Sequence, residues 1–185
     1  FWFTNIDIIK RKGKRFGFVK IKENTLYWYA LVNEKFYSED IDLMETFKEF
    51  HPDVLEMISK TSKENIILND IIDLKPMEKW STENLCLIGD SAHATTPNMG
   101  QGGCQAVEDA YIIGKLLETQ KDWNKIFHQF ERIRKSKVNH IVKTSWTLGK
   151  VAQWENFTGL RNFVFRNMPE SVNQKQMEKI LKLEL

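Results

Sequence analysis

"LCLIGDSAHATTPNMGQGGCQAVEDAYIIGKLL", residues 85–117, is the stretch that decides the fold. A short apolar run ends in Gly-Asp, a polar loop with one proline and three glycines follows, and a helical pattern runs from Cys104 to Leu117. An apolar run of this length is typical of a buried strand in a parallel sheet. Proteins of this α/β type bind ligands beyond the carboxyl ends of their strands, so we expect a binding site between strand and helix.

The polar residues of this loop suit a particular kind of ligand. Asp90 follows the expected strand, where its carboxylate can accept hydrogen bonds from a sugar or polyol hydroxyl, each worth about 1.5 to 3 kcal/mol. The alternative is that Asp90 only caps the following turn. Gly100, Gly102 and Gly103 allow a flat or charged ligand to approach the helix N-terminus, which favours anionic or electron-rich groups. The glycines alone match neither a dinucleotide fingerprint nor a phosphate loop.

Composition narrows the class of protein. The chain has 185 residues, 42% of them hydrophobic, which is enough for a core and lies between one ordinary domain and two small ones. A formal charge of +2 argues against a nucleic-acid partner. Cys86 and Cys104 stand in unrelated contexts, so we expect free thiols in a reducing compartment, with Cys104 buried and inert. No run has the length of a membrane span and no signal peptide is visible, so the cytoplasm is the expected location.

The chain outside the central stretch is expected to add a sheet and several helices. Residues 1–37 are rich in aromatic and β-branched residues and predict strands with a turn near Glu23 and Asn24. Helices are expected over 41–50 and from His51-Pro52 to about Ser59, and β-type runs over 65–69 and 71–74. A long amphipathic helix is expected beyond Asp122, and a short one at the end. The first residue is not Met and lies in a strand-like run, which suggests a fragment, a processed chain or half of a split protein.

One segment carries a family resemblance. "LIGDSAHATTPNMGQGGCQAVEDA", residues 87–110, closely resembles the second FAD-contacting motif of class A flavoprotein monooxygenases, the aromatic hydroxylases with their salicylate hydroxylase-like and zeaxanthin epoxidase-like relatives. "DLKPMEKW" before it and "FHQFERIRKSKV" after it look like the flanking segments of that family. The resemblance implies an α/β fold with α+β character. Residues 1–70 would belong to a β-sheet substrate domain, 71–120 to a Rossmann-like FAD-binding domain, and 121–185 to a C-terminal helical region.

The resemblance also assigns roles to individual residues. Asp90 would bind the ribityl portion of FAD, with Gly89 allowing close approach, and Pro97 would lie beside the isoalloxazine ring. Backbone N–H groups facing the pyrimidine edge of the flavin would come from Gly100, Gln101, Gly102 and Gly103. In this family NADH or NADPH reduces FAD, and a flavin hydroperoxide made with dioxygen delivers one oxygen atom to a small hydrophobic or aromatic substrate.

Other residues have competing interpretations. Tyr27, Trp28 and Tyr29 are candidates for a wall of the substrate pocket, although alternation along a strand would place some of them in the core. His93 is expected to be a hydrogen-bonded structural residue. Glu108 and Asp109 are expected to suit the dipole of the following helix. The histidines and cysteines lack metal-ligand spacing, so we expect no metal site.

The sequence departs from the family pattern by lacking an initial G-x-G-x-x-G and a mid-chain Asp-Gly motif. A missing N-terminal half of the enzyme is therefore the expected partner, and the chain reads as the C-terminal half. Two alternatives remain open. One is a non-oxygenating FAD-dependent oxidoreductase, such as a geranylgeranyl reductase-like or halogenase-like enzyme. The other is a non-enzymatic remnant or interaction module that binds no flavin alone.

Overall fold

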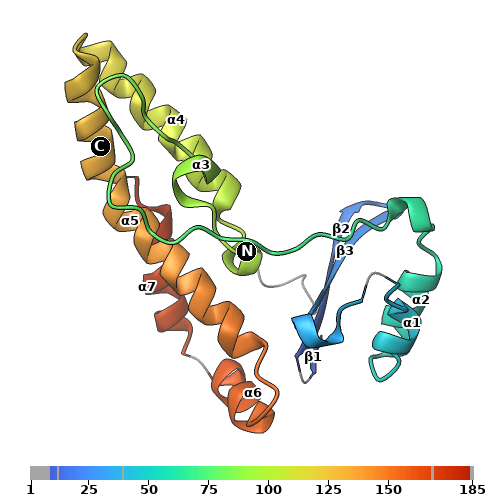
Figure 1. Ribbon diagram of the computed structural model, residues 1–185. Helices are drawn as coiled ribbons and strands as arrows, with labels where there is room; N and C mark the ends of the chain where they lie inside the picture. The colour runs from blue at the N-terminus through green and yellow to red at the C-terminus, as the bar shows by residue number, and fades with distance from the viewer. Residues whose placement is uncertain (1–8, 12, 39, 168, 184–185) are drawn as a thin grey trace. The chain divides into compact units, whose positions relative to one another are not determined.

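The structure is a computed structural model that describes residues 9–11, 13–38, 40–167 and 169–183. The chain divides into two compact units (Figure 1). The first comprises residues up to Asn69 together with Val151–Val164, and the second comprises Asp70–Lys150 with Phe165–Leu185. The division into regions 1–70, 71–120 and 121–185 stays a prediction. None of the helices in the described ranges has both the length and the apolar character that a membrane crossing requires.

The first unit contains an antiparallel sheet of β1 (Ile9–Arg11), β2 (Lys14–Lys22) and β3 (Thr25–Val32), in the order β1-β2-β3. Glu23 and Asn24 form the turn between β2 and β3, as the sequence predicted. The register pairs Phe16 with Ala30 and Phe18 with Trp28. Successive side chains of a strand point to opposite faces, so these four residues share one face.

Two short helices cover the face of the sheet that carries Phe16. They are α1 (Leu43–Thr46) and α2 (Pro52–Ser59), and a 3-10 turn, η1 (Glu34–Phe36), precedes them. The Phe16 ring stacks on Trp28 with centroids 5.3 Å apart and meets Phe47 edge-on at 5.9 Å. The buried core of this unit consists of Phe16, Phe47, Phe50, Val54 and Ile58.

The prediction of α2 is confirmed, with Pro52 in its first turn. The helix expected over 41–50 is wrong in length, because α1 ends at Thr46. The Lys48 N–H then bonds to the carbonyl of Glu45, three residues back, instead of continuing the α-helical pattern of bonds four residues apart. The strands expected over 65–69 and 71–74 are also wrong. That segment begins with the 3-10 turn η2 (Lys63–Asn65) and then continues as irregular chain, with Ile72 76% exposed. No strand in the described residues pairs with it.

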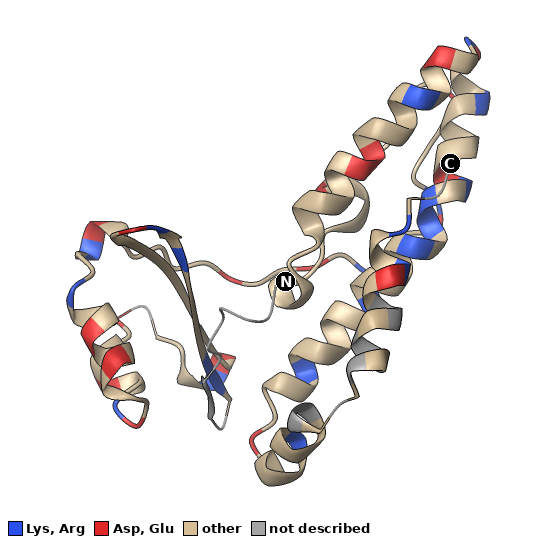
Figure 2. Ribbon diagram, turned by 180° about the vertical axis from the view of Figure 1, so that it is seen from behind, with Lys and Arg blue, Asp and Glu red and all other residues tan. Residues whose placement is uncertain are grey.

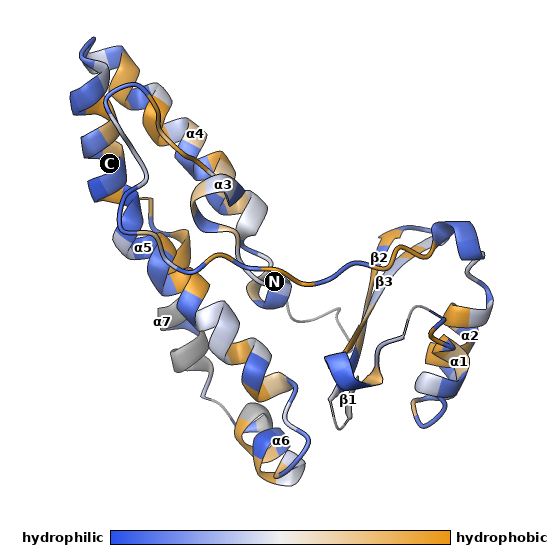
Figure 3. Ribbon diagram, viewed as in Figure 1, coloured by the Kyte–Doolittle hydropathy of each residue, from blue (hydrophilic) through white to orange (hydrophobic). Residues whose placement is uncertain are grey.

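The second unit is mainly helical, with α3 (Asp90–His93), the 3-10 turn η3 (Pro97–Met99), α4 (Gly102–Thr119), α5 (Trp123–Ala152) and α7 (Glu170–Leu181). The last two residues of α5 belong to the first unit, and α6 (Thr158–Arg166) also begins there. Hydrophobic positions recur along α4 and α5 (Figure 3). The core of this unit consists of Trp80, Ala92, Ile112, Leu116, Ile126, Phe130, Val138 and Val142.

The buried strand expected over 85–88 is not formed. Cys86 makes only an isolated bridge with Ser81, and the Leu87 N–H donates to the Trp80 carbonyl. Leu85 is 53% exposed and Ile88 40% exposed. A strand needs hydrogen-bonded neighbours on its edges, and the described part of this unit offers no other strand to supply them. The helices expected after Gly103 and after Asp122 are confirmed as α4 and α5.

Candidate functional site

The Gly-Asp turn has a conformation that only glycine adopts readily. Gly89 has φ +56° and ψ −140°, and it is the N-cap of α3, whose first residue is Asp90. A Cβ at Gly89 would lie 3.1 Å from the Cβ of Ala106 on α4, so the turn also lies tightly against that helix. Asp90 itself is exposed. The fold therefore presents a carboxylate on a sharp turn that rests on α4.

The glycine loop meets this turn at the beginning of α4. Gly100 has φ +62° and ends η3, and α4 starts at Gly102. A Cβ at Gly102 would lie 3.9 Å from Oδ1 of Asp90, so the two predicted motifs are neighbours in space. A Cβ at Gly100 or Gly103 would meet no atom within 4 Å in the described part of the chain. The space beside these two glycines is open in the described chain, so packing alone would allow a side chain there.

The first N–H groups of α4 are not capped by the side chain that precedes them. Within the described residues, the N-cap Gln101 makes no side-chain hydrogen bond to the first N–H groups of the helix. Its side-chain oxygen instead accepts a bond of 3.2 Å from Gln105. The N–H groups at the start of an α-helix have no intrahelical acceptor and carry partial positive charge. The Asp90 carboxylate can accept hydrogen bonds from the hydroxyls of a ligand, and these N–H groups can donate to an electron-rich edge of the same ligand.

The turn that contains Pro97 is held by α5. Ser145 is fully buried, and its hydroxyl donates to the Thr96 carbonyl at 2.6 Å. The Asn98 side-chain amide donates to the Ser145 carbonyl at 3.1 Å and to the Thr96 hydroxyl at 2.8 Å. A Cβ at Gly149 would come within 2.4 Å of that amide nitrogen, so a side chain there would displace the Asn98 amide. Pro97 is thereby fixed in position while remaining exposed.

A buried ionic network underlies the Gly-Asp turn. Oδ2 of Asp109 accepts the Gly89 N–H at 2.8 Å and lies 2.7 Å from Nε2 of His93. Oδ1 of Asp109 accepts from Nε of Arg134 at 2.7 Å. Burial alone would raise the pKa of Asp109, but the bonds from His93, Gly89 and Arg134 lower it below its ordinary value. An ionised Asp109 is an acceptor only, so His93 donates through Nε2.

Arg134 is balanced by further partners on α4. Its guanidinium also pairs with Glu108 at 2.7 Å and donates to Oε1 of Gln105 at 2.7 Å. Glu108 in turn binds Lys137 at 2.6 Å. Acidic positions on α4 and basic positions on α5 are visible in Figure 2. The helix dipole expected for Glu108 and Asp109 does not account for these ion pairs with Arg134, whereas the hydrogen-bonded structural role expected for His93 is confirmed.

A signal for this network was present in the sequence. Ile126, Phe130, Val138 and Val142 are buried at steps of four or eight residues along α5. Arg134 falls on the same stripe and is 1% exposed. A charged residue in the middle of an apolar stripe requires a buried acidic partner, and Asp109 provides it. The role of Asp109 was missed because its partner is 25 residues away in the sequence.

The aromatic residues proposed for a substrate pocket divide between the two faces of β3. Trp28 belongs to the core face, where it stacks on Phe16 and donates to the Thr61 hydroxyl at 2.9 Å. Tyr27 is 54% exposed, and Tyr29 lies over Gly17, where a Cβ would come within 2.5 Å of its ring. Burial raises the pKa of Tyr29. Tyr27 and Tyr29 stay predictions for the substrate site, and Trp28 serves the core.

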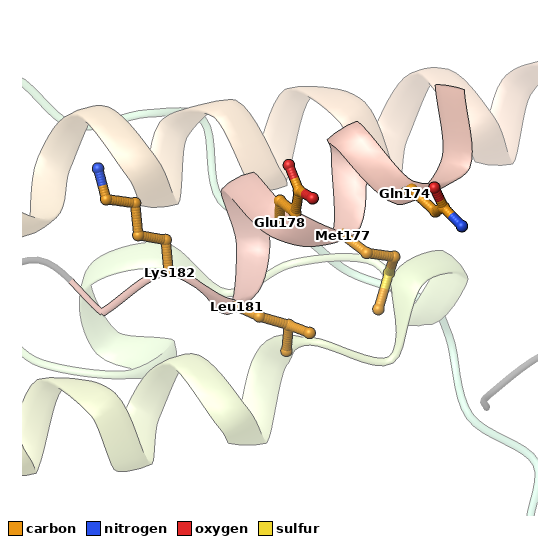
Figure 4. Close-up of a pocket in the computed structure, with 5 residues that line it drawn as sticks. All are labelled: Gln174, Met177, Glu178, Leu181 and Lys182. Carbon is orange, nitrogen blue, oxygen red and sulfur yellow. The ribbon is translucent and has the colours of Figure 1, made fainter. Parts of the chain in front are cut away.

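Two further features lie outside the predicted cofactor residues. A surface hollow on α7 is lined by Gln174, Met177, Glu178, Leu181 and Lys182 (Figure 4).

Both cysteines are free, as expected, but Cys104 is exposed and the prediction that it is buried is wrong. In α4 the buried positions are Gln105, Asp109, Ile112 and Leu116, and Cys104 is not among them. Burial raises the pKa of Cys86 to about 11, with the carboxylates of Glu131 and Asp109 adding to the effect.

Comparison with known proteins agrees with a flavin site. A family model for an FAD binding domain matches residues 33–151. Aurachin C monooxygenase/isomerase of Stigmatella aurantiaca is 35% identical over 149 residues, which cover 78% of this chain and 39% of that protein. The 2-heptyl-3-hydroxy-4(1H)-quinolone synthase of Pseudomonas aeruginosa (strain UCBPP-PA14) is 29% identical over 91% of this chain and 46% of its own length.

A solved structure extends the agreement to the fold. HpxO of Klebsiella pneumoniae, complexed with FAD and uric acid, superposes with a TM-score of 0.81 at 20% identity, covering 95% of this chain and 48% of that one. The family match and the fold define part of a flavoprotein. The chain belongs to the class A family of FAD-dependent monooxygenases, and the predicted family, fold class and FAD cofactor are confirmed. The chain spans less than half the length of these relatives.

Proposed function

We propose that the complete protein is an FAD-dependent monooxygenase and that the segment from Gly89 to Gly103 holds its flavin. The observation that carries the proposal is the proximity of Asp90 to Gly102 at an α-helix N-terminus whose first N–H groups receive no cap from the Gln101 side chain in the described structure. The cofactor supplies the redox chemistry when bound. The residues of this chain bind and orient it.

Each residue of the segment has a physical task in this proposal. Asp90 accepts hydrogen bonds from the ribityl hydroxyls, and the turn at Gly89 directs it away from the core. The N–H groups of Gly102 and Gly103 donate to the electron-rich edge of the ring, where preorganised donors favour negative charge on reduction. Pro97, fixed through Ser145, offers a rigid apolar contact to the ring. Gly100 and Gly103 leave room for the ring because their missing side chains would meet no atom of the described chain.

The proposal includes an N-terminal half that completes the site. The chain spans 39% to 48% of the relatives named above, so residues outside it would hold the ADP portion of FAD. Apolar side chains that this half could cover are exposed in the segment before Gly89, at Leu85 and Ile88, and on α4, at Val107 and Tyr111. Covering such surface contributes favourably at roughly 25 cal/mol per Å² of apolar area.

The remaining parts of the proposal concern reactants and location. We propose NADH or NADPH as the reductant, dioxygen as the oxidant and a small hydrophobic or aromatic molecule as the substrate. Uric acid, an aromatic heterocycle, is present in the HpxO complex, which supports this substrate class. Tyr27 and Tyr29 are proposed to line the substrate site. The free thiols of Cys86 and Cys104 support a cytoplasmic location.

The binding proposal is tested with Asp90→Ala in the complete gene product. Loss of a charge-assisted hydrogen bond of about 1.5 to 3 kcal/mol corresponds to roughly a 10- to 150-fold rise in the Kd for FAD, measured by quenching of flavin fluorescence. Glu118→Gln is the matched control, because Glu118 is an exposed carboxylate on α4 that pairs only with Lys115 among the bonds described. A Kd for Asp90→Ala within twofold of the unmodified protein would contradict the proposal.

Oxygen transfer is tested separately. With isotopically labelled dioxygen, an NAD(P)H-dependent reaction should place one labelled oxygen atom in an aromatic product. Oxidation of NAD(P)H with no labelled product over a broad aromatic panel would favour a non-oxygenating oxidoreductase. Failure of the complete gene product to retain flavin would favour a non-enzymatic remnant.

A further inference from the structure

The Gly-Asp turn is held at both ends by one oxygen atom of α4. Oδ2 of Asp109 accepts the N–H of Gly89, immediately before Asp90, at 2.8 Å. The same oxygen lies 2.7 Å from Nε2 of His93, the last residue of the one-turn helix that Asp90 begins. The residue that precedes Asp90 and the residue that ends its turn are therefore fixed to the same point. The position of Oδ2 of Asp109 therefore sets the direction in which the Asp90 side chain faces.

Asp109 lies on the same helix as the N–H donors. It comes seven residues after Gly102 on α4, which at about 1.5 Å per residue is roughly 10 Å along the helix axis. A rigid helix thus connects the donors at its N-terminus with the carboxylate that holds the Asp90 turn. The spacing between the acceptor at Asp90 and the donors at Gly102 and Gly103 is set through Asp109.

The support of Asp109 itself is rigid. Arg134 donates to its other oxygen, Oδ1, at 2.7 Å, and both side chains are almost completely buried. The imidazole of His93 is 4% exposed and packs on Trp80 with ring centroids 5.3 Å apart. A carboxylate with donors at both oxygens and no access to water has little freedom to rotate. Small displacements of Asp109 would pass directly to Gly89 and His93.

We propose that Asp109 is a positioning residue for the flavin, which acts through Gly89 and His93 to set Asp90 at the correct distance and angle from the N-terminus of α4. This inference rests on the proposed function, because it takes Asp90 and the donors of α4 as the flavin-binding groups. Its content is that the affinity for FAD and the environment of the bound flavin depend on a residue that does not touch the flavin.

The test compares Asp109→Asn with Glu108→Gln in the complete gene product. Asparagine has nearly the same shape but replaces one acceptor oxygen with an NH2 donor. In one orientation the NH2 faces the Gly89 N–H and in the other it faces Arg134, and either donor-to-donor contact displaces the side chain from its position under the Gly-Asp turn. Glu108 is the matched control, because it is an adjacent acidic residue paired with the same Arg134 and makes no contact with Gly89 in the described structure. For each variant we would measure the melting midpoint without FAD, the Kd for FAD and the visible circular dichroism of the bound flavin.

The expected result is a Kd for FAD at least 10-fold higher in Asp109→Asn, together with a changed flavin circular dichroism spectrum. Glu108→Gln should keep the Kd within twofold and the spectrum unchanged, even with a similar fall in melting midpoint. An unchanged Kd and spectrum in Asp109→Asn would overturn the inference. An equal rise in Kd for Glu108→Gln would also overturn it, because affinity would then follow stability alone.

A second variant keeps the inference testable if Asp109→Asn does not fold. His93→Phe removes one donor to Oδ2 but retains an aromatic ring against Trp80. It should raise the Kd for FAD at least fivefold, and an unchanged Kd would overturn the inference. Asp90→Ala separates the two proposals: if its Kd is unchanged, the proposed flavin site fails, whereas a raised Kd with no effect of Asp109 or His93 defeats the positioning role alone.

Discussion

Replacing Arg134 by methionine is expected to destabilise α4 more than any surface change in the same unit. Methionine keeps a long unbranched side chain but removes the guanidinium, which makes bonds of 2.7 Å to Asp109, Glu108 and Gln105. Removing one partner of a buried ion pair costs about 3 to 5 kcal/mol. Asp109 keeps its bonds to Gly89 and His93, so we expect the lower end, about 3 kcal/mol.

Hydrogen–deuterium exchange of the complete gene product measures this change locally. At about 1.4 kcal/mol per factor of ten, a loss of about 3 kcal/mol should speed exchange of the protected amides in α4 roughly 100-fold. Lys115→Met is the control, since it removes an exposed pair with Glu118 that is worth no more than about 0.5 kcal/mol. Exchange in α4 that rises less than fivefold in Arg134→Met, or no more than in the control, would refute the reasoning.

Three further predictions follow from individual residues. Gly103→Ala should leave the fold intact or stabilise α4 by up to about 1 kcal/mol in thermal unfolding. The same variant should raise the Kd for FAD at least fivefold. A normal Kd would argue against close approach of the flavin to Gly103. The pKa of Asp109 is lowered on folding, so its stabilising contribution is complete above about pH 4 and is lost as the pH falls through the folded value. Between pH 5 and pH 3, Asp109→Asn should therefore lose less stability than the unmodified protein, as measured by urea unfolding. Equal losses in the two proteins would contradict this. With a pKa of about 11, Cys86 should be alkylated by iodoacetamide at pH 8 much more slowly than the exposed Cys104. Peptide mass spectrometry measures the two rates. Equal rates would contradict the burial of Cys86.

The sequence predicted the elements whose stabilising contacts are close in the chain. The turn at Glu23 and Asn24, the proline at the start of α2 and the amphipathic pattern of α5 are all local signals, and each is found in the structure. The glycine loop was likewise placed correctly at the start of α4. Asp90 and Gly102 are neighbours in space although the expected strand before Asp90 is not formed, and their joint role in one site stays a prediction.

The sequence failed where an element depends on partners far away. The apolar run over 85–88 has the composition of a strand, but a strand forms only with neighbours, and in the described residues Cys86 pairs with Ser81 alone. The runs over 65–69 and 71–74 failed for the same reason. Asp109 was interpreted from its position in a helix, whereas its role comes from Arg134 on another helix. Local patterns do not identify such pairs. The exception is a charged residue within an apolar stripe, such as Arg134 on α5, which requires a buried acidic partner.

The central claim is that the segment from Gly89 to Gly103 holds the flavin, and a crystal structure of the complete gene product with FAD tests it most directly. The account predicts that the N–H groups of Gly102 and Gly103 lie within about 3.2 Å of acceptor atoms on the pyrimidine edge of the ring. It also predicts that the Asp90 carboxylate accepts a hydrogen bond from a ribityl hydroxyl. A bound FAD whose ring and ribityl chain lie elsewhere, with Asp90 and the start of α4 exposed to solvent, would contradict the account.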